Sequence, residues 1–253
     1  MGKNTSMDTE VMIEVKGLWK GFGGYWVLQG VDFSIREGEI FVVMGRSGVG
    51  KSVLLKNLIG LMKPDRGEIY YKGLEISSAS PAEWKNIRKE FAVVFQHSAL
   101  FDSLDVEGNV AFGLRRMTDL SEDEIKARVR ECLAMVDLEG IEHLKISELS
   151  GGMQKRVAIA RAIALNPRVI FYDEPTTGLD PIMSAVITRL VKRMNTEIHS
   201  TSFIITHDLK LAFNSATTIA MLHDGKIIEV GTPEKIKASE NPIVKKFVEG
   251  IPD

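Results

Sequence analysis

The chain has 253 residues, of which 26% are charged, and a formal net charge of −2 at pH 7. This balance gives no indication of bulk nucleic-acid binding, and no stretch approaches the roughly 20 consecutive apolar residues that a membrane-spanning helix needs. The polar segment Met1–Glu10 also lacks the apolar region of a signal peptide. We therefore expect the chain to act in the cytoplasm, and any role at a membrane to come through a partner.

The first predicted strand, Val11–Val15, is followed by a predicted loop, Lys20–Trp26. The loop carries three aromatic side chains, Phe22, Tyr25 and Trp26. Aromatic residues in loops usually cover the edge of a core, but one of these could instead stack on a purine base, since such stacking is favourable and tolerant of sequence. Residue type does not separate the three; we select Phe22 and keep the other two as alternatives.

A glycine-rich segment lies between the buried strand Ile40–Met44 and a helical pattern over Val53–Ile59, as a phosphate-binding P-loop requires. Its glycines allow successive backbone N–H groups to point at an anion, and the helix adds the positive end of its dipole. We expect Lys51 to reach the β- and γ-phosphates and the Ser52 hydroxyl to ligate Mg²⁺. The predicted nucleotide-binding loop consists of Gly45, Arg46, Ser47, Gly48, Val49, Gly50, Lys51 and Ser52.

A further buried strand, Phe91–Phe95, ends at Gln96, and the pattern then changes character. From residue 97 to about residue 150, β-branched clusters give way to amphipathic helical periodicity, with a capping box that begins at Ser121. Cys132, the only cysteine, excludes an intramolecular disulfide, and its helical spacing from apolar residues predicts a buried thiol. We predict that residues 97–150 form a helical segment inserted in an α/β core.

The segment Leu149–Arg156 (LSGGMQKR) opens another helix, and the apolar strand Arg168–Tyr172 follows it. This strand delivers Asp173 and Glu174 at its carboxyl end, and a later buried strand is followed by His207. In open α/β sheets the ligand crevice lies outside the carboxyl ends of the strands. The P-loop and the acidic pair are therefore expected at the same edge of one sheet.

Together these motifs resemble the ATP-binding-cassette (ABC) ATPases along the whole chain. The P-loop, Gln96, Leu149–Gly152, Asp173–Glu174, Gly178–Asp180 and His207 occur in that family's order. The Leu-Ser-Gly-Gly signature distinguishes the ABC ATPases from other P-loop proteins, since a P-loop alone fits many nucleoside triphosphatases. The resemblance implies one ABC ATPase domain over residues 1–253: a RecA-like P-loop core with an antiparallel β subdomain and an inserted α-helical subdomain at about 97–150.

The resemblance also implies residue roles in ATP hydrolysis. Asp173 would bind Mg²⁺ directly or through its hydration shell, and Glu174 would polarise the attacking water as general base. His207 would contact the γ-phosphate and hold Glu174 in line, and Gln96 would sense Mg²⁺ and the attacking water. The implied cofactors are ATP and Mg²⁺.

A second anion site is expected where Ser150, Gly151 and Gly152 open a helix. One chain does not need two cradles for a γ-phosphate. The family resemblance implies a head-to-tail homodimer instead, in which each signature caps the ATP held by the other chain's P-loop. Asp180 would reach across that interface.

Within the family, the P-loop and the segments 95–104, 109–112 and 153–156 are similar to the ATPase subunit of Mla-type systems, which move phospholipids between the membranes of Gram-negative bacteria. This implies a peripheral location on the cytoplasmic side of the inner membrane, bound to an integral permease of MlaE type. It allows for a periplasmic lipid-binding subunit of MlaD type and a small cytoplasmic regulator in the same complex. The ATPase subunit of a small-molecule ABC importer is the alternative.

A third interpretation, a soluble ABC protein acting on ribosomes or DNA, is disfavoured by the single cassette and the lack of a long heptad run, and we expect no nucleic-acid partner. The segment Ala99–Leu104 mixes apolar and polar residues just after Gln96. It either packs the helical insertion or forms a groove for a permease helix. We favour the groove.

Overall fold

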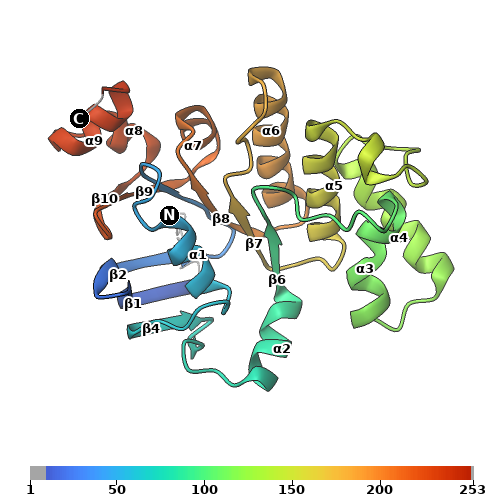
Figure 1. The fold of residues 1–253 in the computed structure, drawn as a ribbon, viewed down its shortest axis with the longest axis horizontal. Coiled ribbons are helices and arrows are strands. Elements are labelled where there is room, and N and C mark those ends of the chain that lie inside the picture. The colour runs from blue at the N-terminus through green and yellow to red at the C-terminus, as the bar shows by residue number, and fades with distance from the viewer. Residues whose placement is uncertain (1–9, 252–253) are drawn as a thin grey trace, which may run out of the picture.

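A computed structural model describes residues 10–251; residues 1–9 and 252–253, and with them most of the polar segment considered above for a signal peptide, lie outside the described residues. Within the described part, a six-stranded sheet has the order β10-β9-β3-β8-β7-β6, and a four-stranded sheet has the order β2-β1-β4-β5. Helices surround the first sheet, and the second lies at one side of the molecule (Figure 1). The predicted α/β fold with an antiparallel subdomain is confirmed.

The six-stranded sheet determines where the chemical groups gather. Strands β3, β6, β7, β8 and β9 run parallel, and β10 pairs antiparallel with β9. Strand β8 is buried along its whole length, as expected for a parallel strand covered on both faces. The strands are β3 (Ile40–Met44), β6 (Phe91–Val94), β7 (Val169–Asp173), β8 (Thr201–Thr206), β9 (Thr218–His223) and β10 (Lys226–Gly231).

The antiparallel sheet corrects one sequence-based expectation. The predicted loop Lys20–Trp26 is mostly strand, because only Gly23 and Gly24 form the turn of a hairpin in which Phe22 pairs with Tyr25. Both glycines have positive φ, 55° and 87°, which two-residue hairpin turns favour. The strands are β1 (Val11–Phe22), β2 (Tyr25–Arg36), β4 (Arg66–Tyr71) and β5 (Leu74–Glu75).

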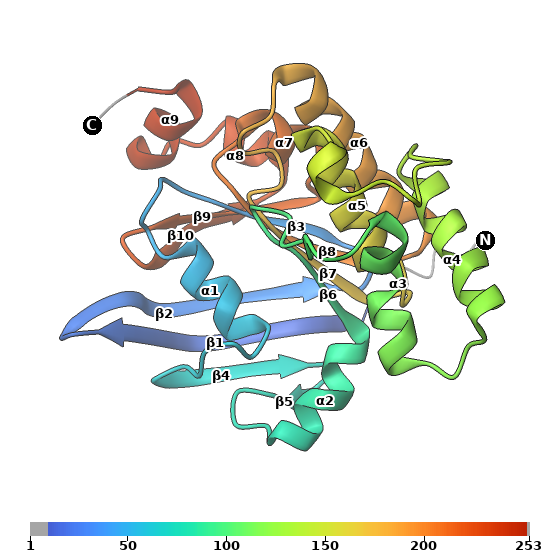
Figure 2. The ribbon, with the colours of Figure 1, turned by 45° about the vertical axis from the view of Figure 1, so that its right-hand side comes forward.

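Helix α1 lies between the two sheets, contacting β2 of one and β7 and β8 of the other (Figure 2). Helices α3, α4 and α5 pack against one another beside the β6 edge. The capping box predicted at Ser121 forms, and a second capping box is present at Ser80. The helices are α1 (Lys51–Leu58), α2 (Pro81–Glu90), α3 (Val106–Met117), α4 (Glu122–Met135), the 3₁₀ helix η1 (Ile146–Glu148), α5 (Gly151–Ile163), α6 (Pro181–Glu197), α7 (Leu209–Ser215), α8 (Pro233–Lys237) and α9 (Pro242–Glu249).

Two hydrophobic cores hold the layers together. One fills the space between the six-stranded sheet and helices α3 to α7, and the other joins the two sheets around α1. Cys132 is fully buried in the first core, as predicted, and burial raises the pKa of its thiol to about 11. Among the described helices, none combines the length and the apolar character needed to cross a bilayer.

Candidate functional site

The P-loop connects β3 to α1 and depends on close backbone packing. A Cβ on Gly45 would lie 2.4 Å from the carbonyl oxygen of Leu222 in β9, so this position requires glycine. Gly50 precedes α1 with φ of 107°, a conformation that L-residues rarely adopt. The Arg46 guanidinium donates to the carbonyl oxygen of Ile251, 3.2 Å away, and so ties the loop to the chain beyond α9.

Lys51 is the buried cation of this loop. Its ammonium donates to the carbonyl oxygens of Gly45 (2.7 Å) and Arg46 (3.0 Å). It also lies 3.4 Å from Oε1 of Glu174, and its side chain is only 6% exposed. The expected phosphate-binding cation and the expected general base are therefore immediate neighbours, although Lys51 begins α1 and Glu174 follows β7.

Glu174 follows β7 and is held at one orientation by several donors. Its Oε2 accepts from the backbone N–H of His207 (3.3 Å) and the hydroxyl of Thr206 (3.2 Å), and it lies 2.9 Å from Nδ1 of His207. The residue is buried and has φ of +46°, a left-handed conformation that is costly for a non-glycine residue. Such strain persists where surrounding structure over-determines it, most often at functional sites.

Asp173 is the last residue of β7. Burial raises the pKa of its carboxyl, and the adjacent Glu174 raises it further. Its Oδ1 is buried with no hydrogen-bond partner among the described residues. A cation beside this oxygen would satisfy it, and Ser52 and Gln96 offer further oxygen donors at the same sheet edge, the ligand type that Mg²⁺ prefers. The residues present therefore fit a magnesium ion bound together with phosphate oxygens.

A cavity of about 470 Å³ is lined by Lys51, Ser52, Gln96 and Glu174, whereas Asp173 is not among its lining residues. Of the three candidate aromatics, Phe22 lines it; Trp26 instead packs edge-on against Trp19, and Tyr25 is 82% exposed. The geometry thus favours the residue that we selected from the sequence. The predicted residues that line the cavity are Phe22, Ser47, Gly48, Gly50, Lys51, Ser52, Gln96, Glu174 and His207.

The signature residues do not reach this cavity. Ser150 caps α5, its hydroxyl accepting from the N–H of Met153, and a Cβ on Gly152 would lie 2.6 Å from the side chain of Met183 in α6. Asp180 caps α6 through the N–H groups of Ile182 and Met183. Within one chain, the signature and the P-loop are therefore separate features.

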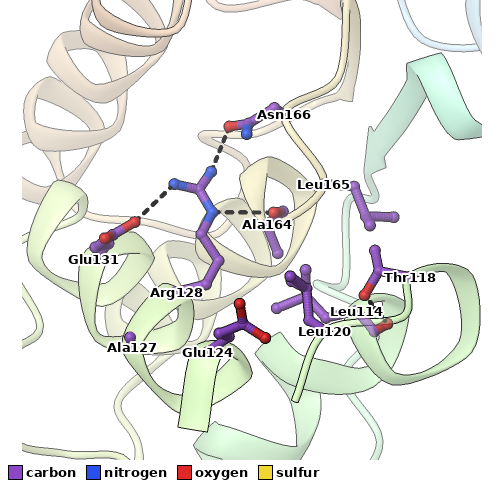
Figure 3. A pocket seen from close by; sticks show the side chains of 10 residues that line it. All are labelled: Leu114, Thr118, Leu120, Glu124, Ala127, Arg128, Glu131, Ala164, Leu165 and Asn166. Carbon is purple, nitrogen blue, oxygen red and sulfur yellow. Dashed lines mark hydrogen bonds and ion pairs between the residues drawn. The ribbon is translucent and has the colours of Figure 1, made fainter. Parts of the chain in front are cut away.

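Another cavity, of about 360 Å³, lies at the opposite end of α5. Figure 3 shows Arg128 reaching from α4 toward Ala164 and Asn166, with Leu114, Leu120 and Leu165 to one side. The guanidinium donates to the carbonyl oxygens of Ala164 (3.1 Å) and Ile163 (3.0 Å). Both residues lie at the end of α5, where carbonyl groups lack helical partners, and the Ile163 carbonyl also accepts from the N–H of Asn166. Arg128 therefore serves as a C-terminal cap.

Sequence reasoning missed two cations on α5, Lys155 and Arg161, that hold the chain from Gln96 to Ala99. The ammonium of buried Lys155 donates to the carbonyl oxygen of Gln96, and Arg161 donates to those of Ser98 and Ala99. Burial lowers the pKa of Lys155, and the nearby carboxylates of Asp173 and Glu174 oppose that shift. The sequence did contain a signal for a buried Lys155, because this residue falls at helical spacing among the buried residues of α5.

Comparison with known proteins identifies the class. The ABC transporter family profile matches residues 28–177, and the chain belongs to this family. It is therefore an ATP-binding-cassette ATPase. A dimeric structure of a post-hydrolysis state of the ATP-binding cassette MJ0796, bound to ADP and Pi, superimposes with a TM-score of 0.80 at 34% identity, covering 88% of this chain and 99% of that one.

Two curated relatives cover nearly the whole chain. The intermembrane phospholipid transport system ATP-binding protein MlaF of Haemophilus influenzae is 39% identical over 96% of this chain and 92% of its own length. The probable ribonucleotide transport ATP-binding protein mkl of Mycobacterium leprae is 41% identical over 99% of this chain and 72% of its own length. The resemblance to Mla-type ATPases predicted from the motifs is confirmed.

Proposed function

We propose that the cavity between Phe22 and His207 hydrolyses ATP. The observation that carries this proposal is the position of Glu174, whose carboxylate lies within ion-pair distance of Lys51 and within hydrogen-bond distance of His207. Lys51 binds the β- and γ-phosphates, Phe22 stacks on the adenine, and the P-loop N–H groups hold the polyphosphate. Glu174 orients and polarises the attacking water, and His207 holds the Glu174 carboxylate in line.

Mg²⁺ would be held by Ser52, Gln96 and Asp173, directly or through water, and would supply charge neutralisation on the phosphate oxygens. Asp173 contributes the buried Oδ1 without a partner. Ser52 and Gln96 line the cavity from the start of α1 and the end of β6. These roles follow from the oxygen donors at one sheet edge.

We further propose a head-to-tail homodimer that buries two ATP molecules. The signature of one chain would cover the P-loop of the other, because Ser150, Gly151 and Gly152 open α5 away from their own chain's cavity. Asp180, at the exposed start of α6, would contact the partner. Two structures of the similar ABC cassette MJ0796 are dimeric, which supports dimerisation of this chain.

The transport role that we propose is phospholipid movement between membranes, through a permease of MlaE type on the cytoplasmic side of a bacterial inner membrane. The similarity to MlaF over nearly the full length of both chains supports it. A periplasmic subunit of MlaD type and a small cytoplasmic regulator would belong to the same complex. The similarity to mkl favours a second candidate, the ATPase subunit of a nucleotide or other small-molecule importer.

The surface proposed to receive a permease helix lies around Phe101. This side chain is 42% exposed and packs against Phe112 of α3, with ring centroids 4.5 Å apart. Leu100 is half-buried behind it, against the hydrophobic core. An exposed aromatic supported by apolar neighbours is the type of surface that a docked amphipathic helix covers.

Affinity purification of the N-terminally tagged chain from detergent-solubilised native membranes tests this proposal. Mass spectrometry of the bound proteins and lipids should find an integral permease, a periplasmic lipid-binding protein and phospholipid. Recovery of a nucleotide, sugar or amino-acid permease with a soluble binding protein would contradict the phospholipid role. Phe101→Asp should lose the permease, whereas Leu74→Asp, on the exposed β5 of the other sheet, should retain it.

A further inference from the structure

The segment Gln96–Phe101 joins the nucleotide cavity to the exposed surface around Phe101 in a conformation that needs support. Ser98 and Ala99 are consecutive non-glycine residues with positive φ, 60° and 48°. Ser98 is nevertheless buried, so the strained turn is packed into the structure. Side chains rarely adopt such backbone angles unless neighbouring groups hold them there.

Helix α5 provides that support through two cations. Lys155, which is 5% exposed, donates to the carbonyl oxygen of Gln96. Arg161 donates through Nη2 to the carbonyl oxygen of Ser98 (2.9 Å) and through Nη1 to that of Ala99 (2.7 Å). Hydrogen bonds from charged donors are stronger than those between neutral groups.

The other end of the segment is held from α3. The buried side chain of Asn109 accepts from the N–H of Phe101 (2.8 Å) and donates to the carbonyl oxygen of the same residue (3.1 Å). The Arg161 guanidinium also lies over the Phe101 ring, 5.9 Å from its centroid. Backbone and aromatic ring are thus fixed to the helix that begins at the signature.

We propose that Lys155 and Arg161 are positioning residues that clamp the segment Gln96–Phe101 to α5. With the clamp formed, the Gln96 side chain in the cavity, the Phe101 ring at the surface and the signature at the start of α5 move as one body. A displacement of Phe101 is then transmitted to Gln96 and to the signature. This consequence rests on the proposed roles of those residues, whereas the clamp itself does not.

Arg156 offers a matched control on the same helix. It too is a partly buried cation that donates to two backbone carbonyl oxygens, those of Val136 (3.2 Å) and Asp137 (2.8 Å). Its acceptors follow α4, away from the segment Gln96–Phe101. Replacing Arg156 therefore removes a comparable cap without touching the clamp.

Hydrogen exchange of the full chain, measured by mass spectrometry without nucleotide, tests the clamp. In Lys155→Met and in Arg161→Met, amides of residues 96–101 should exchange at least about tenfold faster than in the parent chain, because their carbonyl anchors are lost. Arg156→Met should leave them unchanged, and Lys155→Arg should largely restore protection. Unchanged exchange in both clamp variants, or equal acceleration in Arg156→Met, would overturn the proposal.

Magnesium dependence of ATP hydrolysis gives the second measurement, and a global destabilisation would not reproduce it. Lys155→Met should raise the Mg²⁺ concentration for half-maximal activity about tenfold, while ATP binding in EDTA stays unchanged, since the change acts through Gln96. An unchanged Mg²⁺ requirement despite faster exchange in 96–101 would leave the clamp supported and would contradict the proposed role of Gln96 instead. If Lys155→Met weakened ATP binding in EDTA by the same factor of about ten, the change would be a general structural effect, and the positioning role of Lys155 would be wrong.

Discussion

Lys51 and Arg128 make the same kind of hydrogen bond in two very different places. Each cation donates to the carbonyl oxygens of two consecutive residues, in the P-loop and at the end of α5 respectively. Lys51 also faces Glu174, a carboxylate whose side chain is 11% exposed. Arg128 instead pairs with Glu131, whose side chain is 63% exposed.

The difference shows that surroundings, and not the bonding pattern, distinguish a binding group from a capping group. An exposed ion pair contributes little, so Arg128 acts mainly through the carbonyls that it satisfies. Lys51 lines a cavity together with the P-loop residues Ser47 and Gly48, where we expect a polyphosphate to replace its present acceptors. Loss of Lys51 should therefore affect ligand binding, and loss of Arg128 should affect folding stability.

The largest expected effect is on the carboxylate beside Lys51. Glu174→Gln preserves the side-chain shape but removes the base, so ATP hydrolysis should fall by about 100-fold or more. ATP binding should persist, and the ATP-bound homodimer should accumulate in size-exclusion chromatography. Glu131→Gln, the matching change beside Arg128, should leave phosphate release within about twofold of the parent. Normal turnover in Glu174→Gln would remove Glu174 from the chemistry.

Lys51→Met should weaken ATP binding by at least about 100-fold, because two or more charge-assisted hydrogen bonds to phosphate, each about 1.5–3 kcal/mol, are lost. Fluorescence titration with a labelled ATP analogue measures this change. Arg128→Met is the control and should bind the analogue as the parent does. Equal losses in both variants would contradict the distinction between the two cations.

Phe22→Ala should weaken ATP binding by about 1–2 kcal/mol, roughly tenfold, because a stacked base loses its platform. Tyr25→Ala, at the first residue after the hairpin turn, should have no measurable effect, since Tyr25 does not line the cavity. The same titration with labelled triphosphate lacking a base should not distinguish Phe22→Ala from the parent. A larger loss in Tyr25→Ala than in Phe22→Ala would reverse the assignment.

Arg128→Met should lower the free energy of unfolding by about 1–3 kcal/mol, because the carbonyl group of Ala164 loses its donor and that of Ile163 keeps only the N–H of Asn166. Urea titration followed by circular dichroism measures the change. The ATPase kcat of the folded fraction should remain within about twofold of the parent, as expected for a group outside the reacting site. A kcat defect with unchanged stability would contradict the capping role.

Cys132 lies one helical turn beyond Arg128 on α4, and its effect on stability should be visible only in alkali. The thiol ionises near its ordinary pKa of 9.0 when unfolded but near 11 when folded. The unfolded state therefore loses its proton first, and stability should fall by about 2–3 kcal/mol as pH rises from 9 to 11. Cys132→Ala should show a correspondingly shallower decline over that range in chemical denaturation.

Local patterns were sufficient for much of the fold and site. The P-loop was predictable because strand, glycines and helix follow one another directly, and the Ser80 and Ser121 caps needed only four residues each. The meeting of Lys51 with Glu174 followed from the rule that parallel strands present their carboxyl ends at one edge. These features depend on short-range chemistry and one general rule of topology.

Features that depend on packing were less accessible. The loop predicted around Phe22 is a hairpin because β1 and β2 pair almost to their ends, a tertiary choice that glycine content alone did not reveal. The short helix α7 was also missed, since its seven residues leave little periodicity to detect. Lys155 became visible as part of the site only when α5 was seen against Gln96.

The hydrogen bond between Arg46 and the carbonyl oxygen of Ile251 fixes the carboxyl-terminal end of the described chain beside the P-loop. A fluorophore attached at Ile251 would lie beside the guanidinium of Arg46, the residue that precedes Ser47 of the nucleotide cavity. Such a label would report nucleotide occupancy by proximity and would equally disturb it if bulky. A label or tag at the carboxyl-terminal end of this protein could therefore alter nucleotide binding, and its size should be chosen with that in mind.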